Sequence, residues 1–293
     1  MSLAALLTAV VIGATGASSG VTTTSPPTSR DIRPPLEATR VAGAQASGLD
    51  DVTVLKYATS FRVPIASDES GFVWLLGADY AFEDATFDTA LGDIERLQGH
   101  RFALATRGNV PFSERWGLAF ELQAIYASDL SAGASASLQP FARASVAYAY
   151  SSELSLQAAV VWLRTRLGLV PFGGFGAVYR PAGSRWRFNL VIPNPNVSFR
   201  LFDDARLFAR AGLDTSTYAA RLASGDDAFV HRLQIVSSAG IRWRLFGRFA
   251  LSAEAGAVAL QDYEVRNLDT DIASGRVSAL GPYASLAIVR LLD

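Results

Sequence analysis

From residue 52 onward, hydrophobic and polar residues alternate along the chain with a period of two. The clearest segment runs from Trp116 to Tyr126, where large apolar residues hold one parity and Gly, Ala, Glu and Gln hold the other. Successive side chains of a strand point to opposite faces, so this pattern predicts strands with one apolar face. Thirteen runs show it, at about 53–63, 72–82, 100–110, 116–126, 138–150, 154–163, 169–180, 186–192, 196–202, 205–217, 229–243, 247–260 and 276–291.

These runs predict an all-β fold, a closed antiparallel transmembrane β-barrel over residues 51–293. A bacterial barrel of this kind has an even number of strands, so we expect about 12 strands, within a range of 10 to 14. Either the proline-interrupted stretch 185–202 is one bent strand, or the thirteen runs omit one strand. Short breaks and longer polar connections broadly alternate, as tight periplasmic turns and outer loops do in such barrels. The longer connections are expected at 83–99, 127–134, 219–227 and 261–274.

The composition agrees with this architecture. Half of the 293 residues are hydrophobic and the mean hydropathy is +0.22. Past its first residues, however, the chain has no apolar run of the roughly 18 residues that a membrane helix needs. Alternation resolves this contrast, because it places the hydrophobic residues on one face of many short strands, the face that meets lipid in a membrane barrel.

The aromatic residues also favour a membrane barrel. All five tryptophans lie on the apolar parity, and Trp116 and Tyr126 stand ten positions apart, roughly the length of a tilted strand that crosses a bilayer. Side chains with an apolar body and a polar tip belong at membrane interfaces. The alternative is a soluble β-protein with these aromatics in its core. In the membrane interpretation, the interface residues are Trp74, Tyr80, Trp116, Tyr126, Tyr148, Trp162, Trp186 and Trp243.

The N-terminal part predicts export followed by a linker. Residues 1–19 combine the apolar stretch Leu3–Ala14 with a cleavage zone of small residues, although no Lys or Arg precedes Leu3. Residues 20–50 are rich in Pro, Ser, Thr and Ala, which indicates a flexible linker. The segment Val11–Gly20 also looks like the glycine-rich turn of a dinucleotide-binding fold. That motif requires a helix directly after it, and the β-branched and proline residues that follow are unsuited to one.

One stretch carries a family resemblance. Pro171–Leu213 contains Gly-Phe-Gly, Tyr-Arg-Pro, Trp-Arg-Phe, Pro-Asn-Val and Asp-Asp in succession. It resembles a family of uncharacterised Gram-negative outer-membrane β-barrel proteins, a domain of unknown function. The likeness is clearest over residues 168–213 and extends over 55–293. It implies a membrane barrel and brings no catalytic residues. Unlike many outer-membrane barrels, this chain does not end in an aromatic residue but in Asp293.

Charged residues on the polar parity predict the lining of the lumen. Ten are basic and three acidic, and basic rings favour anions in pores. We therefore expect a small passive channel or transporter with an arginine-rich, anion-preferring lumen. The alternative is a plugged barrel with a structural or surface-binding role, in which the arginines pair with acids of inward-folded loops such as Asp88, Asp93 and Glu95. The lumen candidates are Lys56, Arg62, Arg101, Arg107, Arg143, Arg187, Arg206, Arg210, Arg232, Arg242, Asp79, Glu121 and Glu254.

Other chemistry has little support in the sequence. The chain has no cysteine and two isolated histidines, so we expect no metal and no cofactor. The third alternative is an outer-membrane hydrolase that uses His100 or His231. It ranks last, because no spacing places a base beside a nucleophile. A net charge of −1 argues against nucleic acid. The expected partners are the lipid bilayer of a Gram-negative outer membrane, the outer-membrane assembly machinery and small anionic solutes.

Overall fold

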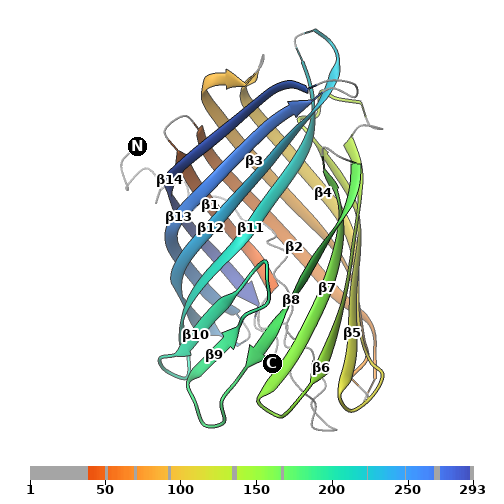
Figure 1. The fold of residues 1–293 in the computed structure, drawn as a ribbon, viewed down its shortest axis with the longest axis vertical. Coiled ribbons are helices and arrows are strands. Elements are labelled where there is room, and N and C mark those ends of the chain that lie inside the picture. Colours follow the sequence, from red (N-terminus) through yellow and green to blue (C-terminus); the bar gives the residue numbers. More distant parts are fainter. Residues whose placement is uncertain are drawn as a thin grey trace.

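The computed structural model describes residues 39–49, 52–68, 71–91, 94–133, 137–165, 168–222, 224–247, 249–266 and 271–290. Within these ranges the chain forms fourteen strands, which wind into one closed barrel (Figure 1). The strands are β1 Thr39–Leu49, β2 Val52–Ser67, β3 Val73–Leu91, β4 Ile94–Pro111, β5 Trp116–Ser128, β6 Leu138–Ala149, β7 Leu154–Thr165, β8 Gly168–Tyr179, β9 Trp186–Asn189, β10 Asn196–Arg200, β11 Ala205–Arg221, β12 Asp227–Phe246, β13 Phe249–Arg266 and β14 Asp271–Arg290.

Each strand pairs antiparallel with its sequence neighbours, and β1 closes the ring against β14, with Thr39 opposite Arg290. The all-β closed antiparallel barrel is therefore confirmed. Fourteen strands within the described ranges lie at the upper limit of the expected range rather than at twelve. Two differences account for this: 185–202 forms two strands, β9 and β10, and a further strand, β1, precedes residue 51. No helix in the described part of the chain is long and apolar enough to cross a membrane.

Strand β1 corrects the expected linker. Residues 39–49 lie within the range 20–50 that composition assigned to flexible chain, yet they pair with β2 and β14 along their length. Alanine, glycine and serine dominate this strand, so its sequence shows little of the alternation that marks the others. Its partners hold it in place instead. The expected signal peptide at 1–19 and the linker residues before 39 lie outside the described residues.

Several expected loops are in fact strand. β3 continues to Leu91 and β4 begins at Ile94, so most of the polar stretch 83–99 is paired. β13 and β14 similarly extend across most of 261–274. In β3 and β4 these extensions reverse the expected parity, because Ala85, Phe87 and Leu97 are buried inside the barrel and polar residues occupy the outer face. Asp84 and Arg96, for example, form an ion pair of 2.6 Å between neighbouring strands.

The barrel has a tryptophan end and an opposite end. At the tryptophan end, the lower end in Figure 1, β5 begins with Trp116, β9 begins with Trp186, and Trp74 and Trp243 lie near strand ends. Toward the opposite end, an apolar cluster fills the interior of the barrel. Its buried members are Val52, Val54, Ala85, Phe87, Ile94, Leu97, Ala103, Ile125, Ala127, Tyr218, Ala220, Leu222, Ala228, Val230 and Val265.

The wall is irregular beside the short hairpin of β9 and β10. β11 pairs with β10 only from Arg206 to Arg210, and beyond this point it leans across the barrel. Its residue Ala219 pairs in parallel with Ser128 of β5, and the backbone N–H of Asp129 donates to the carbonyl oxygen of Ala219 at 2.9 Å. A smaller ring, from β11 through β14 and β1 to β5, thus closes around the apolar cluster.

Candidate functional site

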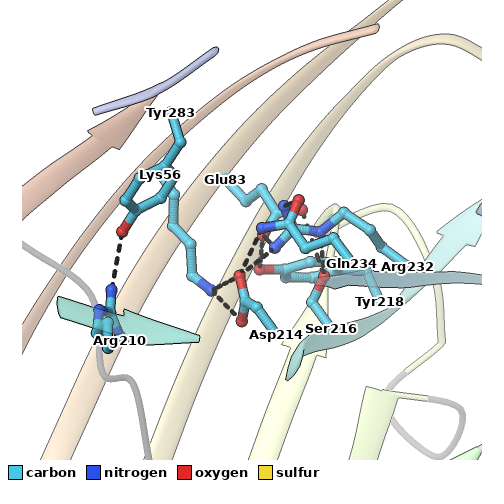
Figure 2. A network of polar contacts seen from close by, with 9 residues as sticks. All are labelled: Lys56, Glu83, Arg210, Asp214, Ser216, Tyr218, Arg232, Gln234 and Tyr283. Atoms are coloured by element: carbon cyan, nitrogen blue, oxygen red, sulfur yellow. Dashed lines mark hydrogen bonds and ion pairs between the residues drawn. The ribbon is translucent and has the colours of Figure 1, made fainter. Parts of the chain in front are cut away.

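A group of polar side chains crosses the interior below the apolar cluster (Figure 2). We call Lys56, Glu83, Asp214, Tyr218 and Arg232 the buried ionic layer. Arg232 Nη2 lies 3.0 Å from Glu83 Oε2 and 3.1 Å from Asp214 Oδ2, while Lys56 Nζ lies 3.3 Å from Asp214 Oδ1. The Tyr218 hydroxyl donates to Glu83 Oε2 at 3.3 Å. These contacts join β2 and β3 to β11 and β12, which are far apart around the ring.

The layer is internally satisfied. Two basic and two acidic side chains balance in charge, and Arg232 also donates to Ser216 Oγ at 3.1 Å and to Gln234 Oε1 at 3.2 Å. Buried charges are tolerated only when partners complete their hydrogen bonds, because removal from water is costly. The register explains the arrangement, since Ser216 stands opposite Arg232 and Asp214 stands opposite Gln234 on the inward parity of β11 and β12.

The Arg232–Glu83 pair of the layer is closed to water, whereas the side chain of Asp214 beside it is 26% exposed. The side chain of Arg232 is 2% exposed and that of Glu83 is 0% exposed, whereas a side chain that lines an open pore would contact solvent. Tyr218 completes the seal, because its ring lies directly over Gly99 of β4. A Cβ atom at Gly99 would come within 2.6 Å of that ring. Only glycine allows this approach, and with it the inward turn of β11 toward β4 and β5.

Toward the tryptophan end, further arginines pair with carboxylates of the strands. Arg210 Nε donates to Glu254 Oε2 at 2.8 Å, and Glu254 also accepts from the hydroxyls of Ser238 and Tyr283 at 3.0 Å each. Arg62 Nη2 lies 2.6 Å from Asp79 Oδ2, and Arg107 Nη2 lies 2.8 Å from Glu121 Oε2. Arg101 donates to the side chain of Gln123 at 3.0 Å. Most of the central arginines therefore carry a charge that a neighbour neutralises.

At the tryptophan end itself, arginines of neighbouring strands stand opposite one another, in a cluster we call the arginine mouth. Arg206 on β11 stands directly opposite Arg200 on β10 and Arg242 on β12. Such like-charge neighbours repel each other. Burial and the charge of Arg206 lower the pKa of Arg180, in the turn after β8, to about 10. Arg242 also lies over the ring of Phe208, 5.5 Å from its centroid. The arginine mouth consists of Arg180, Arg187, Arg200, Arg206 and Arg242.

The structure places all thirteen lumen candidates on the inward parity of their strands, and eight of them appear in the ion pairs just described. Arg143 is buried on β6 in register with Glu121. Sequence reasoning missed Glu83, which it assigned to a loop, and Asp214, which lies on the same parity as Arg206 and Arg210. This shared parity was the sequence signal that could have identified Asp214 as a residue of the interior.

The source of the acids also needs correction. The plugged-barrel alternative expected acids from inward-folded loops, whereas the acids that pair in the interior belong to strands β3, β5, β11 and β13. Glu95 is exposed on β4. The side chain of Asp88, and Asp93 as a whole, lie outside the described residues. The strands of the barrel wall therefore supply both the bases and the acids.

The eight expected interface aromatics lie on the outward parity. Trp74, Trp116, Trp186 and Trp243 are all exposed and lie near the tryptophan end. Tyr148 packs on Trp116 with a centroid distance of 4.7 Å. Trp162 and Tyr126 lie near the opposite ends of β7 and β5, and Tyr80 lies within β3. The aromatics thus form a belt at one end, with fewer members toward the other.

The two histidines lie on the outward parity of β4 and β12. His100 Nδ1 lies 3.0 Å from the hydroxyl of Tyr80, and His231 Nδ1 lies 2.8 Å from Thr217 Oγ1. Only the second contact pairs a base with an alcohol that could act as a nucleophile. Among the described residues, no group of three or more His, Cys, Asp or Glu side chains could hold a metal ion.

No family model and no curated protein matches the chain. Among solved structures, it is similar to a "KdgM porin", with 8% identity and a TM-score of 0.37 over 86% of this chain and 98% of that one. It is also similar to the "Beta Domain of the Bordetella Autotransporter Brka", with 14% identity and a TM-score of 0.22 over 84% and 95% of the two chains. The resemblance to an uncharacterised outer-membrane family stays a prediction.

Proposed function

We propose that this protein is an integral outer-membrane β-barrel whose interior is closed to solutes. The membrane location is supported first by the outer face of the barrel. There, large hydrophobic side chains such as Phe61, Leu104, Leu122 and Phe175 are exposed around the ring. Soluble monomers rarely leave so much contiguous apolar surface in water. A bilayer around the barrel would cover it.

The dimensions of this face fit a bilayer. Trp116 and Tyr126 stand ten residues apart on β5, with Leu118 and Leu122 exposed between them. At ~3.3 Å per residue this spacing is ~33 Å along the strand, and a tilt of ~40° reduces it to ~25 Å, about the height of the apolar band of outer-membrane barrels. Two aromatic levels at this separation match the two interfaces of a membrane.

The observation that carries the closed state is the burial of the Arg232–Glu83 pair in the middle of the barrel. The apolar cluster lies beyond it, so two water-excluding levels follow each other along the interior. This favours the plugged barrel over the open anion-preferring channel. An open channel would require the buried ionic layer to break, which would leave charges without partners.

Conductance in a planar bilayer tests this proposal. The wild-type barrel should give no steady conductance. The double variant Glu83→Ala/Arg232→Ala removes one acid and one base, leaves Lys56 and Asp214 paired, and should raise the frequency of open events. The matched control is Asp84→Ala/Arg96→Ala, which removes an outward ion pair on the neighbouring strands. Steady wild-type conductance would overturn the closed interior.

A second function, anion binding at the arginine mouth, is favoured by the row Arg200–Arg206–Arg242. An anion held among these guanidinium groups would relieve their repulsion and accept their hydrogen bonds. Anion preference would then belong to one end of the barrel instead of the whole lumen. Titration with citrate should show saturable binding at low salt that weakens as salt rises.

The anion proposal has a matched pair of variants. Arg206→Gln should weaken citrate binding at least tenfold, because Arg206 lies at the centre of the row. Arg221→Gln removes an arginine at the opposite end of the barrel, where it pairs with Asp227, and should leave binding unchanged. Equal binding by the two variants would count against a site at the arginine mouth.

Location and partners follow from the same proposal. A Gram-negative host, an N-terminal export signal and the outer-membrane assembly machinery are all required for a barrel of this type to reach its membrane. Fractionation of cells that express the full chain should recover it in the outer membrane, with altered gel mobility before and after boiling. Recovery in the soluble fraction without detergent would contradict the membrane proposal.

A further inference from the structure

The wall of the barrel has an open seam between β8 and β11. The hairpin of β9 and β10 fills the space between them only at the tryptophan end. On the hairpin side, β8 pairs with β9 at Val178 and Tyr179, and hydrogen bonds continue only to Phe175, whose carbonyl oxygen accepts from Ile192 N–H at 3.1 Å. Within the described residues, no strand pairs with β8 beyond this point or with the hairpin side of β11 between Ala211 and Ala219.

The limits of the seam are well defined. At its lower limit, Ala211 N–H donates to the carbonyl oxygen of Pro195 at 3.0 Å. At its upper limit, Gln139 Nε2 of β6 donates to the carbonyl oxygen of Thr217 at 3.2 Å. β8 and β11 flank two further strands at the hairpin, so three strand spacings of ~4.8 Å put them ~14 Å apart there. Above the hairpin, nothing in the described chain occupies this width.

The edges of the seam offer backbone groups at Gly173 and, by alternation from Ala211, at Leu213 and Thr215, but they do not form a complete ladder. The carbonyl oxygens of Phe175 and Ala177 point to the hairpin side, so the backbone groups of Pro171 and Gly173 point the same way by alternation. Pro171 has no N–H to donate. On the facing edge, Gln139 already occupies the carbonyl oxygen of Thr217. An added strand from another chain needs regular donors and acceptors along an edge, and this edge lacks part of them.

The inner face of β7 and β8 behind the seam is apolar. Its side chains nearest to the seam are Ala159, Val161 and Phe172, while Ile192 and Pro193 cover the inner side of Gly174 and Arg143 of β6 stands opposite Val161. Phe172 is 47% exposed although it points inward, whereas Val178, lower on the same face, is 2% exposed. The outer rim is apolar as well, since Phe175 is 70% exposed and Leu213 is 43% exposed. Phe172 thus presents an apolar surface at the level where lipid would surround the barrel.

We propose that this seam is a lateral window through which one acyl chain of a membrane lipid enters the barrel wall and packs against Phe172. The proposal rests on the proposed membrane location. Backbone groups at bilayer depth that lack a strand partner must lie in protein or line a water-filled cavity, so we place the acyl chain against the apolar side chains of the wall and not along the strand edges. A hydrocarbon chain suits a rim and a lining that are mainly apolar, because burial of its methylene groups is favourable.

Three phenylalanines allow a controlled test by photo-crosslinking. The photoreactive analogue p-benzoylphenylalanine replaces Phe172, Phe175 or Phe208 in turn, in vesicles of phosphatidylethanolamine and phosphatidylglycerol. Phe175 faces outward, Phe172 faces inward behind the window, and Phe208 faces inward where β11 is paired on both sides. After irradiation, mass spectrometry measures the fraction of protein with the added mass of one phospholipid. Gel mobility before and after boiling verifies that each variant is folded.

We expect lipid adducts at positions 175 and 172 in comparable yield, and at least tenfold less at 208. Adducts at 175 without adducts at 172 would overturn the window and leave the membrane location intact. Absence of adducts at all three positions in folded protein would overturn the membrane location and the window together. Crosslinks from 172 to a second copy of this chain, in place of lipid, would show that a protein occupies the seam and would equally overturn the proposal.

Discussion

Arg232 of β12 and Glu83 of β3 meet at 3.0 Å inside the barrel, although 149 residues separate them in the chain. The pair links β3 to β12 across the interior, and it lies where a pore would have to pass. Its partners Asp214, Ser216 and Tyr218 come from β11, the strand that leans inward. The lean of β11 and the closure of the interior are therefore one structural feature.

The first prediction concerns this pair. Arg232→Met leaves Glu83 buried without its main partner and should lower the free energy of unfolding by about 3–5 kcal/mol. The double variant Glu83→Leu/Arg232→Met removes both charges and should recover most of this loss. Urea unfolding in detergent micelles measures both values. Arg96→Ala, on an exposed pair, is the control and should give no measurable change. A single variant as stable as wild type would show that the pair is not buried as described.

The second prediction concerns Gly99 beneath the ring of Tyr218. Gly99→Ala places a methyl group within 2.6 Å of that ring, so the ring and β11 must shift. We expect a loss of about 1–3 kcal/mol in unfolding free energy, as for other overpacked sites. Gly117→Ala is the matched control, since no atom lies within 4 Å of its added Cβ. Similar stabilities of the two variants would argue against the close packing of β11 on β4.

The third prediction separates a lipid-facing surface from a water-facing one. Leu104 is 68% exposed in the middle of β4, and Gln98 is exposed nearer its beginning. In a bilayer, Leu104→Arg should cost about 2–4 kcal/mol and Gln98→Arg about 0–1 kcal/mol, because the penalty falls with distance from the midplane. Folding titrations into phosphatidylcholine vesicles measure the difference. In a soluble barrel, both exposed positions would accept arginine equally.

The fourth prediction concerns β1 as the closing strand. Deletion of residues 39–49 would leave β2 and β14 with open edges, which are not tolerated in lipid. The variant should lose the mobility difference between unboiled and boiled samples that marks a folded barrel. Deletion of residues 22–32, the same length within the expected linker, is the control and should keep that difference. A folded barrel without residues 39–49 would mean that β1 is dispensable for closure.

Much of the architecture could be read from the sequence. Alternation of apolar and polar residues located strands such as β5 and β12, because a sheet with an apolar outer face and a polar inner face must repeat every two residues. The same parity gave the inward direction of charged side chains such as Arg62, Arg210 and Arg232, but Glu83 escaped it because its stretch was assigned to a loop. It failed at the ends of β3 and β4, where apolar side chains face inward and polar ones outward, and in β1, where small residues blur it.

The sequence by itself determined the all-β class, the inward and outward parity of the alternating strands and the aromatic level at Trp116. Only the tertiary structure decided which charges meet. Partners such as Glu83 and Arg232 depend on the curvature of the barrel and on the lean of β11, which bring distant strands together across the lumen. Local alternation fixes the side of a strand on which a residue lies. The distance across the barrel is set by all the strands at once, because each pairing register adds to the next around the ring.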